Sequence, residues 1–285
     1  MERNVLLTIA YDGSTFHGWQ KQPGERTVQG YLEQTMTRLF DREILLSGTS
    51  RTDAGVHAYG QRASFKADFG IPTEKIALVV NNALCAREGS ESGRGGFAKA
   101  PIRIVKAEEV PLDFHARFNS KGKRYVYGIC AGINEALADS GLADEAHKSL
   151  VFERNYVYHI GERLDVSAMN EAAGYFVGEH DFKSFEASGG NPRETTVRRM
   201  FAAGVNETGA AGAAAKAGSL QRIEFTIEGD GFLYNMVRIM TGTLVEVGQG
   251  KRRPEEMKEV IEAGDRQSAG HTAPPGGLCL AEVFY

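Results

Sequence analysis

Apolar and polar residues follow two periodicities along this chain. Residues 5–11 form an apolar, β-branched run of the kind found in core strands, and residues 123–130 have the same character. From Thr27, a suitable N-cap, apolar residues recur at helical spacing through residue 40. Over 222–228, isoleucine and phenylalanine alternate with charged and polar residues, which predicts a half-buried strand. The chain therefore interleaves predicted strands with predicted helices.

Further elements follow from the same patterns. The other predicted helices are 76–84, 165–177 with Gly178 as its stop, an apolar one through 233–247, and 254–264. A loop containing Gly141 leads to a strand at 156–160, and the glycine-rich tracts 86–101 and 209–218 are interpreted as loops. No strict strand–helix rhythm exists, and hairpin-like signals favour antiparallel pairing. We expect an α+β protein whose two sheet-containing halves are residues 1–114 and 115–285.

Composition narrows the class of protein. Of 285 residues, 42% are hydrophobic and 25% charged, which is typical of a globular chain rather than a disordered or fibrous one. The net charge of -4 gives no overall attraction for polyanions, so a nucleic-acid site must be a local basic surface. Three widely spaced cysteines indicate neither a disulfide framework nor a zinc ribbon, and no signal peptide or membrane span is predicted. These features favour a cytoplasmic protein.

The most informative stretch is 48–58, which reads GTSRTDAGVHA. Two glycines bracket a short segment that carries the carboxylate of Asp53, the guanidinium of Arg51 and several small residues, so a planar ligand could approach closely. An arginine two residues before an aspartate is more often a surface pair. On these grounds Asp53 is only a candidate. No phosphate-binding glycine loop of the common nucleotide-cofactor folds occurs, and no histidine pair has metal-ligand spacing with a third donor nearby.

The run SRTDAGVHA is similar to the active-site signature of the TruA-type tRNA pseudouridine synthases. Four other segments resemble that family in the same order: YDGSTFHGWQKQPGERTVQGYLE, PLDFHARFNSKGKRYVY, DGFLYNMVRIMTGTLVEVG and AGHTAPPGGLCL. The resemblance implies the pseudouridine synthase fold with an active-site cleft between the two halves. It also implies isomerisation of uridine to pseudouridine in tRNA, at positions 38 to 40 of the anticodon stem-loop, by a homodimer. That reaction needs neither a metal nor a cofactor.

The resemblance also assigns residues. Asp53 matches the family's catalytic aspartate, which acts either as a nucleophile or by deprotonating C2′ on the way to a glycal; the sequence leaves both open. Burial raises the pKa of a carboxylate, so an ionised Asp53 needs a cation, and Arg238 matches the family's basic partner. Tyr125 matches the active-site tyrosine that lies against the target base and can act as a general base. Arg51 resembles the arginine that holds the target nucleotide out of the helix.

Basic residues recur where a tRNA groove would need them. We expect Lys123 and Arg124 to contact the substrate, together with Arg117, Lys121, Arg193, Arg198, Arg199, Lys251, Arg252 and Arg253. His57, His115 and Trp19 are interpreted as structural residues.

The match has departures. Ser50 stands where the family commonly has glycine, and 84–101 and 186–199 differ from its usual pattern, so the substrate is less firmly indicated than the reaction. A pseudouridine synthase for another RNA site and a non-catalytic tRNA-binding protein on the same fold therefore remain alternatives. A generic aspartate-dependent hydrolase is the weakest, because no second carboxylate accompanies Asp53 and no nucleophile elbow occurs.

Overall fold

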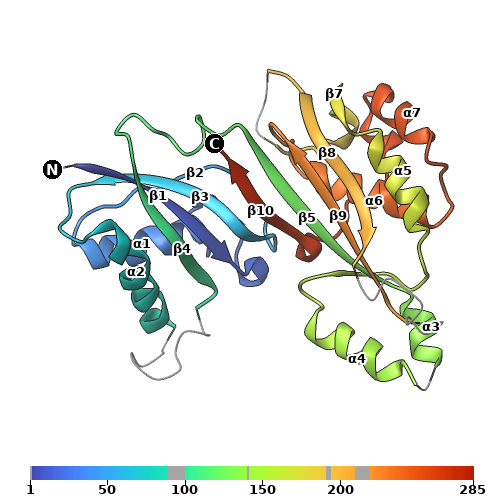
Figure 1. The fold of residues 1–285 in the computed structure, drawn as a ribbon, viewed down its shortest axis with the longest axis horizontal. Coiled ribbons are helices and arrows are strands. Elements are labelled where there is room, and N and C mark those ends of the chain that lie inside the picture. The colour runs from blue at the N-terminus through green and yellow to red at the C-terminus, as the bar shows by residue number, and fades with distance from the viewer. Residues whose placement is uncertain (1, 89–99, 140, 191–193, 209–218) are drawn as a thin grey trace. The chain divides into compact units, whose positions relative to one another are not determined.

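The computed structural model describes residues 2–88, 100–139, 141–190, 194–208 and 219–285 (Figure 1). They form two compact units, Met1–Lys121 with Leu280–Tyr285, and Gly122–Cys279. Each unit combines mainly antiparallel strands with helices, so the α+β prediction is confirmed. These units divide between 121 and 122, and residues 280–285 belong to the first unit; the division at 114 and 115 stays a prediction. Most of the predicted loops 86–101 and 209–218 lies outside the described residues.

The first unit is built on a long antiparallel sheet. β1 (Arg3–Tyr11) lies between β3 (His57–Ala67) and β4 (Ile102–Val110), and it pairs antiparallel with both. The short β2 (Ser47–Gly48) pairs with β3 at Ser64 and Ala63. β10 (Leu278–Phe284) follows β3 in the strand order. The predicted strand at 5–11 is thus the centre of this sheet.

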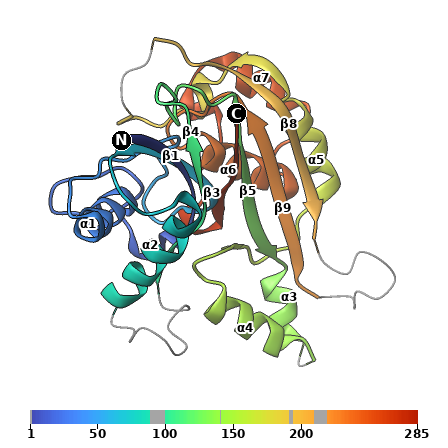
Figure 2. The ribbon, with the colours of Figure 1, turned by 60° about the vertical axis from the view of Figure 1, so that its left-hand side comes forward.

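Two helices cover one face of that sheet (Figures 1 and 2). α1 (Val28–Phe40) begins at the predicted N-cap, because the Thr27 hydroxyl accepts a hydrogen bond from the Gly30 amide. α2 (Thr73–Arg87) includes the predicted segment 76–84. The core between helices and sheet contains the side chains of Leu7, Ile9, Leu32, Met36, Ile76 and Val80, each fully buried. A 3-10 turn, η1 (Gly13–Thr15), follows β1.

The second unit contains four strands that pair antiparallel in the order β5 (Gly122–Ala131), β9 (Gln221–Gly229), β8 (Val197–Glu207) and β7 (Gly178–Asp181). The predicted strands at 123–130 and 222–228 are the neighbouring strands β5 and β9, which pair antiparallel. Tyr125 faces Ile227 and Tyr127 faces Phe225 across this pair. Burial alternates along β9 as its sequence predicts.

One face of this sheet carries α5 (Val166–Gly174), α6 (Met236–Gly248) and α7 (Glu256–Ala263) (Figures 1 and 2). α6 is buried on nearly every side, which explains its almost continuous apolar sequence. α7 ends at Gly264 in a left-handed conformation, as predicted. Short 3-10 turns complete the unit: η3 (Lys183–Phe185), η4 (Arg266–Ser268) and η5 (Pro275–Gly277).

Three predictions for this unit were wrong in detail. The segment around Gly141 holds two short helices, α3 (Ile133–Ala138) and α4 (Ala143–Phe152), because its apolar residues pack into a small core with Cys130 and Leu220. The strand at 156–160 is reduced to β6 (Tyr158–His159), which runs parallel to β5. α5 ends at Gly174 rather than at Gly178, since Phe176 turns inward against Phe185 and Phe225.

Candidate active-site residues

Asp53 lies in the loop 49–56, which joins β2 to β3 and is fixed to β3 by a buried glutamine. The Gln61 side chain donates to the Ser50 carbonyl (2.8 Å) and accepts from the Ser50 amide (3.2 Å). The Thr49 amide donates to the Arg62 carbonyl (2.8 Å). Gln61 is fully buried, so these bonds are shielded from water. The start of the loop therefore has a single well-defined path along the strand.

The segment 11–19 holds the other end of the same loop. The Trp19 amide donates to the Thr52 carbonyl (3.0 Å), and the Gly55 amide donates to the Phe16 carbonyl (3.2 Å). The hydroxyls of Tyr11 and Thr52 are hydrogen-bonded at 2.7 Å. These contacts fix the backbone on both sides of Asp53, whose own carbonyl accepts from the Val56 amide (3.2 Å).

Two glycines allow this close approach. Gly18 has a φ of +81°, and a Cβ built there would lie 2.5 Å from the Thr52 carbonyl oxygen. Gly48 lies against the indole of Trp19, and a Cβ there would be 2.3 Å from its Nε1. Trp19 is almost completely buried, in keeping with the structural role predicted for it. Any larger residue at either position would displace the segment that carries Asp53.

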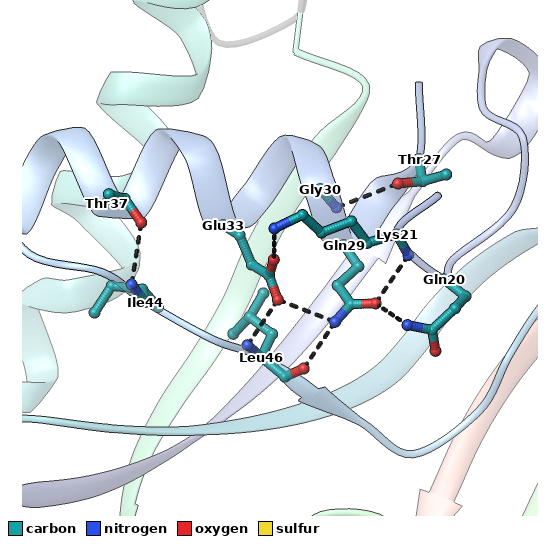
Figure 3. Close-up of polar contacts among 9 residues, drawn as sticks. All are labelled: Gln20, Lys21, Thr27, Gln29, Gly30, Glu33, Thr37, Ile44 and Leu46. Carbon is teal, nitrogen blue, oxygen red and sulfur yellow. Dashed lines mark hydrogen bonds and ion pairs between the residues drawn. The ribbon is translucent and has the colours of Figure 1, made fainter. Parts of the chain in front are cut away.

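A buried carboxylate organises the chain that leads into β2 (Figure 3). Glu33 of α1 accepts from the Leu46 amide (2.9 Å) and from the Gln29 side chain (3.0 Å), and it forms an ion pair with Lys21 (3.0 Å). Gln29 in turn donates to the Leu46 carbonyl (3.0 Å). Because Leu46 directly precedes β2, this network fixes the strand from which loop 49–56 departs.

Within the loop, the two predicted functional side chains differ in exposure. Asp53 is half-buried and Arg51 is exposed. Arg51 forms no hydrogen bond or ion pair with another described residue, so its guanidinium is directed to solvent. His57 is buried at the end of the loop, where its Nδ1 accepts from the Gly13 amide (3.1 Å) and lies 3.3 Å from Asp12. The loop thus presents a carboxylate from a backbone fixed on both sides, with an exposed cation two residues away.

The second unit places Tyr125 near the start of β5. Its side chain is only 7% exposed, and its ring meets Phe232 edge-to-face at 4.9 Å between centroids. Lys123 lies on the same face of the strand and is half-buried. Arg124 lies on the opposite face, where its Nε is 2.7 Å from Glu228. Lys123 and Tyr125 therefore share one face of β5, and Arg124 lies on the other face.

Arg238 lies in the first turn of α6 and is half-buried. Its Nε donates to the Ala273 carbonyl (2.8 Å), and its Nη1 donates to the Asn235 side chain (2.7 Å). Asn235 precedes the helix in a left-handed conformation, with a φ of 59°. The guanidinium is therefore held in one orientation by the helix entrance and by the segment that precedes β10.

Tyr127 holds the same segment from the sheet. Its hydroxyl donates to the Pro274 carbonyl (2.6 Å), and Gly277 packs against its ring. Burial raises the pKa of Tyr127 well above its ordinary value, and the charge of Arg238 opposes that rise. Tyr127 therefore stays protonated and acts as a hydrogen-bond donor.

Several residues that support these side chains were not predicted. Gln61 lies three residues after the signature, but β3 (HAYGQRASFKA) contains several other polar residues, so no local pattern marked this glutamine as buried. Glu33 lies on the apolar face of α1, where a charge needs partners. Asn235 and Ala273 gave no such signal, because they meet Arg238 only in the folded unit.

The described residues contain no group of three or more His, Cys, Asp and Glu side chains placed to hold a metal ion. In the same part of the chain, every helix is too short or too polar to cross a membrane. All three cysteines are free, and Cys85 and Cys130 are buried.

The chain is similar to known proteins over nearly its whole length. The model of a family described as tRNA pseudouridine synthase matches residues 7–119 and 172–285. A protein of Clostridium perfringens named tRNA pseudouridine synthase A 2 is 41% identical over 283 residues, which is 99% of this chain and 100% of that protein. Proteins named tRNA pseudouridine synthase A from Caldicellulosiruptor bescii and Acetivibrio thermocellus are each 40% identical, over 99% of this chain and 100% of their own.

Proposed function

Because this chain belongs to the tRNA pseudouridine synthase family, it isomerises uridine to pseudouridine in tRNA, and we propose that Asp53 is the carboxylate that carries the reaction. The observation that supports this assignment is the loop 49–56 itself. Its backbone is held on both sides of Asp53 by Gln61, Trp19 and Phe16. A carboxylate that must meet a reacting atom benefits from such a fixed backbone.

The reaction is an isomerisation, so its balance needs no external reactant. The N1–C1′ glycosidic bond breaks, the uracil turns, and a C5–C1′ bond forms. The hydrogen on C5 is lost to solvent or base, and N1 gains a proton. Asp53 serves either as a nucleophile or as the base that removes a proton from C2′. Both roles require an ionised carboxylate when the nucleotide binds.

The other assigned residues divide between binding and proton transfer. Tyr125 offers a ring face to the uracil, and its hydroxyl can accept or donate a proton. Arg51, exposed and directed to solvent, is suited to a phosphate or to the space that an extruded base leaves. Lys123, on the same face as Tyr125, is proposed to bind the substrate. Arg124 is proposed to do so as well, although its pairing with Glu228 means that it must first exchange partners.

Arg238 is proposed to stabilise the ionised form of Asp53 during the reaction. A guanidinium provides this charge at any physiological pH. Its bonds to Ala273 and Asn235 hold it in place without neutralising it, because a carbonyl and a side-chain amide are both uncharged acceptors.

The substrate site and the assembly are narrower proposals. We propose that the modified uridines are those at positions 38 to 40 of the anticodon stem-loop, that the working unit is a homodimer, and that the enzyme acts in the cytoplasm. The family resemblance supports each of these.

A tritium-release assay tests the proposal. Unmodified tRNA transcribed with uridine labelled at C5 is incubated with the purified protein in the presence of a chelator, and pseudouridine is then mapped by position. Wild-type protein is expected to release tritium and to modify the anticodon arm. The Asp53→Asn variant is expected to bind the same tRNA and to release none.

The alternatives give different results. Modification at positions outside the anticodon arm would confirm the reaction but show that the proposed substrate positions are wrong. Binding of tRNA without tritium release by the wild-type protein would indicate a non-catalytic tRNA-binding protein. Full activity in Asp53→Asn would refute the assignment of the carboxylate.

A further inference from the structure

The segment 111–121, between β4 and β5, carries an aromatic side chain in an unusual position (green in Figure 1). Phe118 is 77% exposed, the largest value among the exposed large hydrophobic residues of the described chain. Leu112 in the same segment is also largely exposed. A single exposed phenylalanine is common on protein surfaces, so the case for a binding surface rests on the backbone and the charges around this ring.

The backbone beneath Phe118 is rigid. The Ala116 amide donates to the Ser64 hydroxyl (3.1 Å), and the Lys121 amide donates to the Phe284 carbonyl (2.9 Å). The Ala116 carbonyl accepts from the hydroxyls of Thr49 (3.0 Å) and Tyr285 (2.8 Å). Thr49 is the first residue of the loop that carries Asp53. Phe118 therefore projects from a frame that is directly hydrogen-bonded to the catalytic loop.

The ring of Phe118 is also supported from one side. The His115 ring lies 4.3 Å away, tilted by 33°. His115 is itself held by a tight turn, in which its amide donates to the Asn119 side chain (2.8 Å) and its carbonyl accepts from the Asn119 amide (3.0 Å). The Arg117 amide donates to the His115 Nδ1 (3.1 Å). Because Phe118 remains 77% exposed beside this support, most of the ring is accessible to a ligand.

The charge around this ring is positive. Arg117 and Lys121 are both exposed, and neither forms an ion pair with a described carboxylate. Asp113 is the single acidic residue of the segment. The Arg117 guanidinium lies 5.8 Å from the Phe118 ring centre, so the cation and the ring face are presented together.

We propose that Phe118 is a stacking platform for an unpaired base of the tRNA, with His115 as its support and Arg117 as the ligand of a neighbouring phosphate. This proposal rests on the proposed function and extends it to a second contact outside the target uridine. Unpaired bases are the match, because only a base outside a duplex offers a free face to an aromatic ring. The cations favour RNA over an apolar protein partner.

Equilibrium binding of unmodified tRNA, measured at several salt concentrations, tests the proposal. Phe118→Ala is expected to raise the Kd about 5- to 150-fold, the range for loss of one stacked base, and Phe118→Trp is expected to restore it. The slope of log Kd against log salt is expected to stay unchanged in Phe118→Ala, since no charge is lost. In Arg117→Ala that slope is expected to fall by about 0.7 to 0.9, the value for one phosphate.

A matched control exists in the same chain. Phe152, the last residue of α4, is 74% exposed and lies outside the segment 111–121. Phe152→Ala removes an equally exposed ring from a different surface, and we expect it to leave the Kd unchanged. Thermal unfolding of both variants checks that neither alters the fold.

Three results would overturn the proposal. The first is a Phe118→Ala Kd equal to that of the wild type. The second is a change of oligomeric state of Phe118→Ala in light scattering, which would place the ring between copies of this chain. The third is absence of tRNA binding by the wild type. Failure of the proposed function looks different, because the wild type would then bind tRNA and form no pseudouridine.

Discussion

Arg238 and Ala273 are hydrogen-bonded to each other twice. The Arg238 Nε donates to the Ala273 carbonyl (2.8 Å), and the Ala273 amide donates to the Arg238 carbonyl (3.1 Å). The proposed catalytic cation is therefore also a structural tie between α6 and the segment that precedes β10. A substitution at 238 changes both roles, and its effects have to be separated.

Two substitutions make that separation. Arg238→Met removes the charge and the side-chain bonds, so we expect turnover to fall and the acid limb of the pH–rate profile to move to higher pH. Arg238→Lys keeps the charge but loses the Nε–H donor to Ala273. Its turnover is expected to fall while its acid limb stays in place. An acid limb at the wild-type position in Arg238→Met would argue against a role in ionising Asp53.

Tyr125 allows the stacking role to be distinguished from proton transfer. Tyr125→Phe keeps the ring and its contact with Phe232, so tRNA affinity is expected to stay within about twofold. If the hydroxyl moves a proton, as we expect, kcat falls on the order of a hundredfold or more.

Tyr127→Phe is the control for this substitution, since Tyr127 lies on the same face of β5 and its hydroxyl bonds Pro274. It is expected to lose about 1 kcal/mol of unfolding free energy with little change in kcat. A wild-type kcat in Tyr125→Phe would show that the hydroxyl transfers no proton and that the residue acts by stacking alone.

Gly18 and Gly24 form a matched pair of positions that tests the close approach of residue 18 to the loop 49–56. Both have positive φ, +81° and +78°, so alanine strains the backbone at each by about 1 to 2 kcal/mol. A Cβ at 18 also meets the Thr52 carbonyl, whereas a Cβ at 24 has no atom within 4 Å. Gly18→Ala is expected to lower kcat tenfold or more, on the order expected for a displaced catalytic group, and Gly24→Ala to leave kcat unchanged. Equal kcat values would show that the approach of Gly18 to Thr52 does not position Asp53.

Glu33 is expected to matter for stability and for the entry to β2. Glu33→Ala leaves the buried Leu46 amide without its acceptor, which costs about 2 to 3 kcal/mol of unfolding free energy in urea titrations. Glu33→Gln keeps an oxygen acceptor and removes only the ion pair with Lys21, which is half-exposed. The unfolding free energy of this variant is therefore expected to fall by about 1 kcal/mol or less. A loss in Glu33→Gln as large as that in Glu33→Ala would show that the charge, not the acceptor, is what the site requires.

The lowered pKa of His159 predicts that the unfolding free energy depends on pH. Burial lowers the pKa of His159 below 6.5; the nearby Glu153 opposes this shift and Arg222 adds to it. The unfolded chain therefore binds more protons than the folded one below pH 6.5, so the unfolding free energy falls as the pH drops through that range. His159→Gln is expected to flatten this dependence between pH 7 and 5, in urea titrations at each pH.

Glu153 titrates in a lower window. Burial raises its pKa, but hydrogen bonds from Ser149 and Arg222 outweigh that effect and bring the pKa below 4.5. The stability that ionised Glu153 contributes is lost only below pH 4.5. The effects of Glu153 and His159 on stability therefore fall in different pH ranges. An unchanged slope between pH 7 and 5 in His159→Gln would contradict the role given to the histidine.

Local pattern was enough to predict the elements whose own residues form the core. β1, α1 and β9 followed from periodicity, and α1 began at the threonine that its sequence marks. The short helices α3 and α4 were missed because neither is long enough to show a full amphipathic repeat. Their helical state depends on packing against Cys130, just before α3, and against Leu220, which lies far away in the sequence.

The signature around Asp53 identified the loop, but not what holds it. The hydroxyls of Thr49 and Tyr285 are 2.9 Å apart although 236 positions separate them. No window of sequence contains both residues, so neither periodicity nor motif could predict the contact. Gln61 was nearer, yet only the fold shows that its amide bonds the Ser50 backbone.

The return of β10 to the first unit has a consequence for biosynthesis. Domains usually fold on the ribosome in the order in which they emerge. Here the unit that carries Asp53 lacks Tyr285, and with it one partner of Thr49, until the whole of Gly122–Cys279 has left the exit tunnel. During synthesis, loop 49–56 thus gains its contact with Tyr285 only after the second unit has been made.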